Sequence, residues 1–151
     1  ESNNTQLIWQ TGSYYYNKIV EKWKEKTPKG IQIHQFIKEM NYAYGAADLI
    51  ISRAGALSIS ELCIVGKPII LIPSPNVSED HQTKNAMALV HADAAILVKD
   101  NESRSVLSQT IFDTLEDKSK LQKLSKNIKT LAKPEATNTI VQSIENILNK
   151  S

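Results

Sequence analysis

The sequence has little of several features that mark specialised protein classes. Its 151 residues include a single cysteine, Cys63, so no internal disulfide can form, which fits a reducing cytoplasm. One cysteine and three histidines argue against a structural zinc site. The formal net charge is only +2 and no basic run is present, so no nucleic-acid partner is indicated. The longest apolar stretches, such as residues 69–72, are far too short to span a bilayer, and no signal peptide is visible.

The composition is that of an ordinary soluble globular domain. Hydrophobic residues make up 41% of the chain and charged residues 23%. The length is enough for one domain with a real core, and neither repeats nor a linker divide it. We therefore expect a single domain over residues 1–151. Cys63 falls in an apolar helical stretch and is expected to be a core residue rather than a nucleophile.

Apolar runs alternate with helical patterns over most of the chain. Strands are predicted at residues 6–10, 31–34, 48–52, 69–72 and 94–98, and helices at 14–26, 38–47, 57–65, 80–91, 103–115, 118–131 and 135–149. Ser78 or Asp80 is expected to cap the helix at 80–91. The alternation predicts an α/β fold, a parallel sheet flanked by helices that binds ligands at the carboxyl ends of its strands. The segment from 103 onward is predicted to be almost entirely helical.

The most informative stretch is SRAGALSISE, residues 52–61, which lies between an apolar run and a helical pattern. Gly55 lets the backbone approach a ligand closely, and the start of the helix offers unpaired N–H groups to an anion. Glu61 lies about two turns into that helix, where its carboxylate could accept hydrogen bonds from sugar hydroxyls. Two plainer interpretations stay open: the small residues serve close packing only, and Glu61 lies on an exposed helix face.

Two further segments follow predicted strands. Residues 73–85 are dense in side chains that bind hydroxyls, namely Asp80, His81, Gln82 and Asn85. A hydrogen-bonding role for His81 is favoured over general-base catalysis because no acid–base partner is evident. The alternative is that the cluster caps a helix and orders a loop.

Phe36 and Ile37 follow the predicted strand at 31–34. This pair of apolar side chains could flank a planar base. It could equally belong to the core, and the residues alone leave both interpretations open.

Together these segments resemble the C-terminal domain of the MurG family of bacterial glycosyltransferases. The resemblance rests on Phe36-Ile37, on SRAGALSISE at 52–61, on Gly66-Lys67-Pro68, and on DHQTKNA at 80–86, and it covers roughly residues 5–150. It implies the C-terminal half of a two-domain GT-B fold, with a Rossmann-like parallel sheet. The family transfers N-acetylglucosamine from its UDP form to lipid I, making lipid II for peptidoglycan and thus for the cell wall.

The resemblance also implies roles for matching residues in binding UDP-N-acetylglucosamine. Ile37 would bind uracil through its backbone with Phe36 beside it, Glu61 would hold the ribose hydroxyls, and Gly55, Ala56, Leu57 and Ser58 would face the diphosphate and sugar. Gln82, with His81 adjacent, would contact hydroxyls of the N-acetylglucosamine, and Arg53 would shape the loop near the donor.

The resemblance implies as well what this chain would lack. The family's acceptor site and catalytic base belong to an N-terminal domain, so we expect no catalytic residue here, no metal, no cofactor and no activity of the chain alone. We expect a fragment with a truncated first βα unit, whose unpaired sheet edge invites self-association. The full-length enzyme is expected on the cytoplasmic face of the inner membrane. Two alternatives are the donor-binding subunit of a split glycosyltransferase and a non-catalytic nucleotide-binding α/β module.

Overall fold

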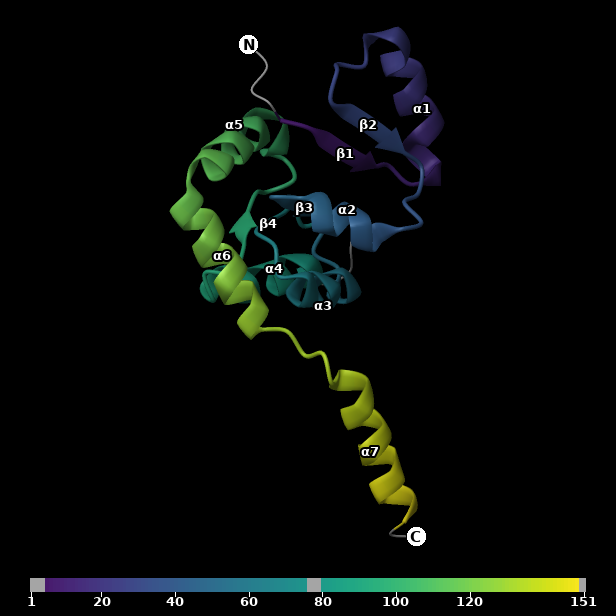
Figure 1. Ribbon diagram of the computed structural model, residues 1–151, viewed down its shortest axis with the longest axis vertical. Helices are drawn as coiled ribbons and strands as arrows, with labels where there is room; N and C mark the ends of the chain where they lie inside the picture. The colour runs from purple at the N-terminus through teal and green to yellow at the C-terminus, as the bar shows by residue number, and fades with distance from the viewer. Residues whose placement is uncertain (1–4, 76–79, 150–151) are drawn as a thin grey trace. The chain divides into compact units, whose positions relative to one another are not determined.

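The fold is given by a computed structural model, which describes residues 5–75 and 80–149 (Figure 1). The chain forms two compact units, one up to Ala46 and one from Ala47 onward, and each is described by itself. In the described residues, no helix is both long and apolar enough to cross a membrane.

The first unit is built on two parallel strands. It contains β1 (Leu7–Gln10), α1 (Ser13–Trp23), the 3-10 turn η1 (Lys24–Lys26), β2 (Ile31–His34) and α2 (Met40–Ala46). The strands pair with Leu7 opposite Ile31. Hydrogen bonds continue past the strand ends, because the N–H of Thr11 donates to the carbonyl of His34 at 2.9 Å. The loops after β1 and β2 are therefore tied together.

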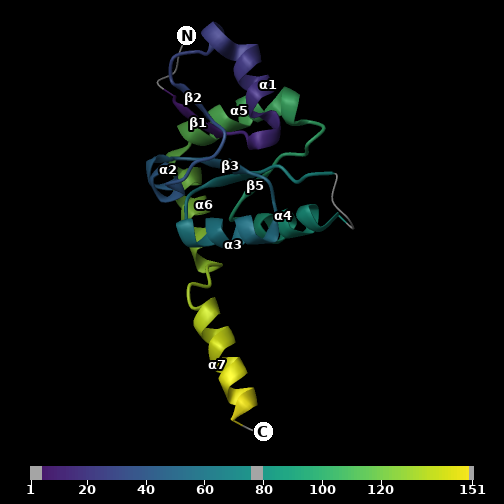
Figure 2. The same cartoon turned by 90° about the vertical axis from the view of Figure 1, so that its right-hand side faces the viewer.

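The second unit holds a three-stranded parallel sheet in the order β3-β4-β5. Its elements are β3 (Ile50–Ser52), α3 (Ala56–Val65), β4 (Ile69–Leu71), α4 (His81–His91), β5 (Ile96–Leu97), α5 (Ser103–Glu116), α6 (Lys118–Thr130) and α7 (Ala136–Leu148). The central strand β4 is completely buried. Helices α3 and α4 lie side by side along one face of this sheet (Figures 1 and 2), and α6 packs against α3.

The end of α3 shows how local sequence sets this packing. Gly66 adopts the left-handed conformation (φ 69°) that ends many helices, and its N–H donates to the carbonyl of Leu62 at 3.0 Å. Its own carbonyl accepts a hydrogen bond of 2.6 Å from Oγ of Ser125 on α6. The turn at Gly66, with Pro68 after it, therefore ends α3 and leads into β4, as the sequence predicted. The same turn also anchors α6.

Every predicted strand and helix is present, with ends that shift by at most three residues. All five strands pair in parallel, as predicted, but their hydrogen bonds join them in two sheets rather than one. Within the described residues, β1 and β3 are each paired along one side only. Each sheet therefore has an open edge.

The predicted cap at Asp80 is wrong. Asp80 is the residue before α4, but its side chain makes no capping hydrogen bond and its backbone is left-handed (φ 55°, ψ 29°). A capping residue usually has an extended backbone, which directs its side chain to the N–H groups of the first turn. The other candidate, Ser78, lies outside the described residues.

Candidate functional site

The loops at the carboxyl ends of the second unit's strands are joined by Arg53. The last ladder bond between β3 and β4 runs from the N–H of Ile72 to the carbonyl of Ser52 at 2.9 Å. Beyond it, Nη1 of Arg53 donates to the carbonyls of Ile72 (3.1 Å) and Pro73 (3.4 Å). The same guanidinium forms an ion pair with Asp100, which follows β5. One side chain thus connects the ends of all three strands.

The next residue, Ala54, is held by two amide side chains from α4. Ala54 is completely buried. Its N–H donates to Oε1 of Gln82 at 3.2 Å, and its carbonyl accepts from Nδ2 of Asn85 at 3.2 Å. Oε1 of Gln82 also accepts from the N–H of Ser74 at 2.9 Å. Side chains of α4 therefore satisfy the buried backbone where the strand ladder has stopped.

The start of α3 leaves backbone donors open. The first intrahelical bond runs from the N–H of Ile59 to the carbonyl of Gly55 at 2.9 Å. In the described part of the chain, no residue accepts from the N–H groups of Ala56, Leu57 or Ser58. The first turn also carries no acidic residue. Open N–H groups at the positive end of a helix dipole are suited to an anion.

Gly55 leaves space over these donors. Its backbone is extended (φ −66°, ψ 145°), a conformation open to any residue. A Cβ at this position would meet only Oγ of Ser58, at an ordinary contact distance of 3.7 Å. Neither the backbone nor the surrounding protein therefore requires a glycine here. Glycine is also favoured over alanine at an N-cap, and beyond that preference it adds room for a ligand to approach the backbone closely.

Glu61 lies on the exposed face of α3 that begins at the first turn. It follows Leu57 by four residues, so the two share a face, and Leu57 is 88% exposed. The carboxylate of Glu61 is exposed, so burial does not force it to find a partner. Glu61 shares an exposed face of α3 with Leu57, whose N–H is one of the open donors, and this position supports a binding role.

Gln82 and His81 open α4 beside this turn. His81 is exposed, whereas Gln82 is half-buried. Two backbone N–H groups point at Oε1 of Gln82, which fixes the orientation of its amide. Within the described residues, Nε2 of Gln82 donates no hydrogen bond. Toward a ligand, Gln82 can therefore act only as a donor.

Phe36 and Ile37 belong to the first unit. Phe36 is 71% exposed, so the interpretation that it is a core residue is wrong. Ile37 is half-buried, and its N–H donates to Oε1 of Gln10 at 2.7 Å. This N–H is therefore already paired, whereas no described residue donates to the carbonyl of Ile37.

Sequence reasoning missed two residues that shape these loops and gave a third residue a different role. Asp100 and Gln10 received no attention, although each stands at or just past the end of a predicted strand, the position that marked the other candidates. Asn85 was interpreted as a hydroxyl-binding residue, but it turns toward the backbone of Ala54. The interpretation that the segment orders a loop is therefore confirmed for Asn85.

Cys63 is a buried core residue, as predicted, with 4% of its surface exposed. Burial raises the pKa of its thiol above the ordinary value, since the thiolate is the form that desolvation penalises. In the described part of the chain, no group of three His, Cys, Asp or Glu side chains could hold a metal ion.

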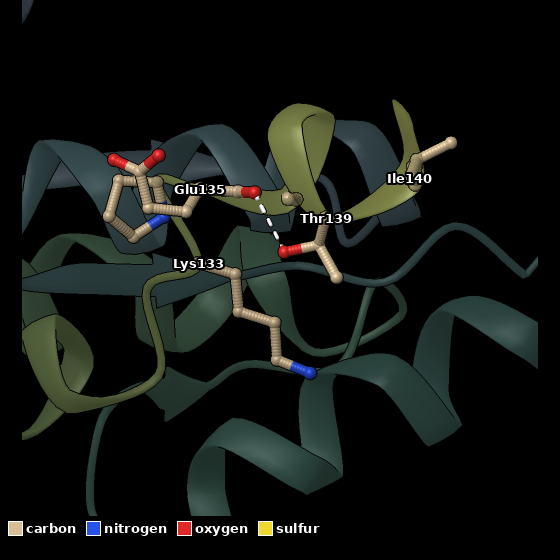
Figure 3. A pocket seen from close by; sticks show the side chains of 6 residues that line it. Lys133, Glu135, Thr139 and Ile140 are labelled. Carbon is tan, nitrogen blue, oxygen red and sulfur yellow. Dashed lines mark hydrogen bonds between the residues drawn. The ribbon is translucent and has the colours of Figure 1, made fainter. Parts of the chain in front are cut away.

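A separate hollow lies at the link between α6 and α7 (Figure 3). It is lined by residues of one short segment, Lys133, Pro134, Glu135, Ala136, Thr139 and Ile140. The hydroxyl of Thr139 donates to the carbonyl of Glu135 at 3.0 Å, an ordinary bond within the helix, and the side chains of Lys133 and Ile140 point in different directions. This hollow is a local feature of a helix start, and no distant segments converge on it.

The chain is similar to known bacterial transferases over almost its whole length. It is 49% identical over 149 residues to the UDP-N-acetylglucosamine--N-acetylmuramyl-(pentapeptide) pyrophosphoryl-undecaprenol N-acetylglucosamine transferase of Parabacteroides distasonis, which covers 99% of this chain and 40% of the relative. It is 51% identical over 144 residues to the transferase of the same name from Cytophaga hutchinsonii, covering 95% and 38%. The chain thus spans about two fifths of the length of these curated relatives.

Solved structures show the same fold. Acinetobacter baumannii MurG superposes with a TM-score of 0.80 at 30% identity, over 95% of this chain and 42% of that one. A glycotransferase of kitacinnamycin shares the fold with a TM-score of 0.62 at 19% identity, over 83% of this chain and 30% of that one. The family model described as the glycosyltransferase family 28 C-terminal domain matches residues 1–140. The chain shares its GT-B type architecture with MurG, and the match to the family model shows that it belongs to the glycosyltransferase family 28 C-terminal domains.

Proposed function

We propose that this chain is the donor-binding domain of an inverting N-acetylglucosaminyltransferase that converts lipid I to lipid II. Its ligand is UDP-N-acetylglucosamine. The names of its relatives describe transfer of N-acetylglucosamine to an undecaprenol-linked acceptor. The observation that carries the proposal is the start of α3, where three open N–H groups lie beside a glycine that no steric contact within the protein requires.

The geometry supports a distinct role for each element. The N–H groups of residues 56–58 would bind the diphosphate, with Gly55 allowing close approach. The Glu61 carboxylate, exposed on the same helix, would accept hydrogen bonds from the two ribose hydroxyls. Nε2 of Gln82 would donate to an oxygen of the N-acetylglucosamine, with His81 adjacent. Arg53 would hold the loop in shape through its bonds to the neighbouring strand ends.

The first unit would supply the contact with the base. Phe36 is exposed at the end of β2 and offers an apolar surface to a planar ring. The carbonyl of Ile37 would accept from the N3–H of uracil. Because guanine presents a different pattern of donors and acceptors, this contact would favour uridine nucleotides over guanosine nucleotides.

The reaction is a direct displacement at the anomeric carbon. An acceptor hydroxyl attacks that carbon, its proton passes to a base outside this chain, and the bond to the diphosphate oxygen breaks, so UDP leaves. The N–H groups and the dipole of α3 stabilise the negative charge that develops on the leaving diphosphate. This chain contributes no catalytic residue, and we expect no turnover without the part of the enzyme that binds the acceptor.

The proposed setting follows from the acceptor. Lipid I is a membrane lipid, so the whole enzyme would work on the cytoplasmic face of the inner membrane, with the acceptor bound by another part of it. For the chain alone we propose self-association through the open edges of its sheets at β1 and β3. Light scattering that shows a monodisperse monomer would contradict this part of the proposal.

Calorimetric titration with UDP-N-acetylglucosamine, UDP and GDP tests the binding function. We expect uridine-selective binding that weakens by about tenfold or more in Glu61→Ala, because hydrogen bonds to a charged group contribute roughly 1.5–3 kcal/mol. Glu145→Ala is the matched control, since it removes an exposed glutamate from α7 instead. Equal affinity for UDP and GDP, or an equal effect of the two substitutions, would contradict the proposal.

A further inference from the structure

The first turn of α3 has to be held in place by groups other than its own backbone donors. Its N–H groups can serve a ligand only while they stay unpaired, so they cannot fix the turn. The strand ladder ends at the bond between Ile72 and Ser52. The residue that connects the strand to the N-cap, Ala54, is buried beyond the reach of water. Both of its backbone groups therefore need partners from the protein.

Those partners are two amide side chains one helical turn apart. Gln82 and Asn85 are three residues apart on α4, so they project from neighbouring positions on one face. Gln82 accepts from the N–H of Ala54 and Asn85 donates to its carbonyl, each at 3.2 Å. The peptide groups on both sides of Ala54 are thereby fixed to α4, directly before Gly55.

We infer that Asn85 is a positioning residue for the anion-binding start of α3. This inference rests on the proposed function. Asn85 acts through the carbonyl of Ala54, which belongs to the peptide group that leads into Gly55 and so sets the direction of the next N–H groups. Nε2 of Gln82 donates to no described residue, whereas the amide of Asn85 donates to a backbone carbonyl of the protein. Its effect on a bound diphosphate is therefore indirect.

The chain offers a matched control in Asn127 on α6. Its Nδ2 also donates to a backbone carbonyl, that of Asp93, at 3.0 Å. Asn85→Leu and Asn127→Leu each replace an amide donor with an apolar side chain of similar shape, and neither adds a charge near the proposed diphosphate site. The two substitutions should destabilise the fold to a similar extent, but only the first one affects the turn before α3.

Titration with UDP and with uridine separates positioning from general stability. We expect Asn85→Leu to weaken UDP binding by about tenfold, the loss of roughly one hydrogen bond to a charged group, and to leave uridine binding unchanged. Asn127→Leu should leave the affinity for both ligands at the wild-type value. A purely structural role for Asn85 would not distinguish a ligand with phosphates from one without them.

Amide hydrogen exchange without ligand is the second measurement. Exchange of the N–H groups of Ala54 and Ile59, which are hydrogen-bonded on either side of the turn, should be faster in Asn85→Ala than in Asn127→Ala, because only the former frees the carbonyl of Ala54. If the wild type binds UDP and both Asn85 variants match it in affinity and exchange, this inference is overturned alone. A wild-type protein that binds no UDP would overturn the proposed function and this inference with it.

Discussion

Replacing Gly55 with alanine should separate binding from folding. The backbone at Gly55 is extended, and an added Cβ meets only Oγ of Ser58 at 3.7 Å. Alanine is a poorer N-cap than glycine by roughly 0.5–1 kcal/mol, while it lowers the entropy of the unfolded chain by about the same amount. We therefore expect the free energy of unfolding to change by less than about 1 kcal/mol.

Binding of UDP should respond much more strongly to the same methyl group. We expect the added Cβ, which directly precedes the open N–H groups of residues 56–58, to keep a phosphate oxygen from reaching all of them. The loss of one charge-assisted hydrogen bond amounts to roughly 1.5–3 kcal/mol, which is an affinity lower by a factor of about 10 to 150. Uridine, which has no phosphate, should bind both proteins equally.

Urea unfolding and calorimetric titration measure the two effects in the same samples. Gly45→Ala is the control, because Gly45 lies in α2 and a Cβ there would meet nothing within 4 Å. That substitution should stabilise the helix by about 0.5–1 kcal/mol without changing UDP affinity. Unchanged UDP affinity in Gly55→Ala would refute the argument that a ligand requires this glycine. Loss of folding would refute the claim that the protein has room for the side chain.

Three further predictions concern the packing and charges of the second unit. Gly66→Ala should lower the free energy of urea unfolding by about 1–2 kcal/mol, because φ is 69° and the new Cβ meets the Lys129 side chain; an unchanged value would show that the turn relaxes. Arg53→Ala removes hydrogen bonds to two carbonyls and an exposed ion pair, so it should lower the free energy of urea unfolding by about 1 kcal/mol, whereas Asp100→Asn, which removes the ion pair alone, should lower it by less. Equal losses in the two variants would show that the ion pair contributes most of the stabilisation. Because burial raises the pKa of the Cys63 thiol, the unfolded chain loses the thiol proton at a lower pH than the folded protein, so the free energy of unfolding should fall as the pH rises above about 8.5. Urea unfolding from about pH 7 to 10 should show a smaller decline in Cys63→Ala than in the wild type. Identical declines would contradict this prediction.

The order of the elements was predictable because each boundary has a local chemical cause. Gly66 and Pro68 end α3 and open β4, and the apolar run at 69–72 forms the buried central strand. The segment 52–61 combined a strand end, a glycine and a helix start, so it could be recognised without contacts. The same local logic failed at Asp80, where a left-handed backbone turned a good capping residue away from its helix.

The contacts that shape the loops were not predictable, because they depend on which way a side chain turns. Gln82 and Asn85 belong to the same polar run, yet Gln82 accepts from the N–H of Ala54 and keeps its own donor open, whereas the amide donor of Asn85 is paired with the carbonyl of Ala54. The bond from the N–H of Ile37 to Gln10 joins residues 27 positions apart. No periodicity or composition links such pairs; only the paired strand ends bring them together.

The choice of amides on α4 follows from two demands on the turn before α3. The turn must be rigid while its N–H groups stay open, so its partners must satisfy one donor and one acceptor of Ala54. A carboxylate at 82 could accept from the N–H of Ala54, but its charge would oppose an anion at the helix start. A carboxylate at 85 could not donate to the carbonyl at all. Neutral amides meet both demands, which explains why this polar run places Gln82 and Asn85 one turn apart.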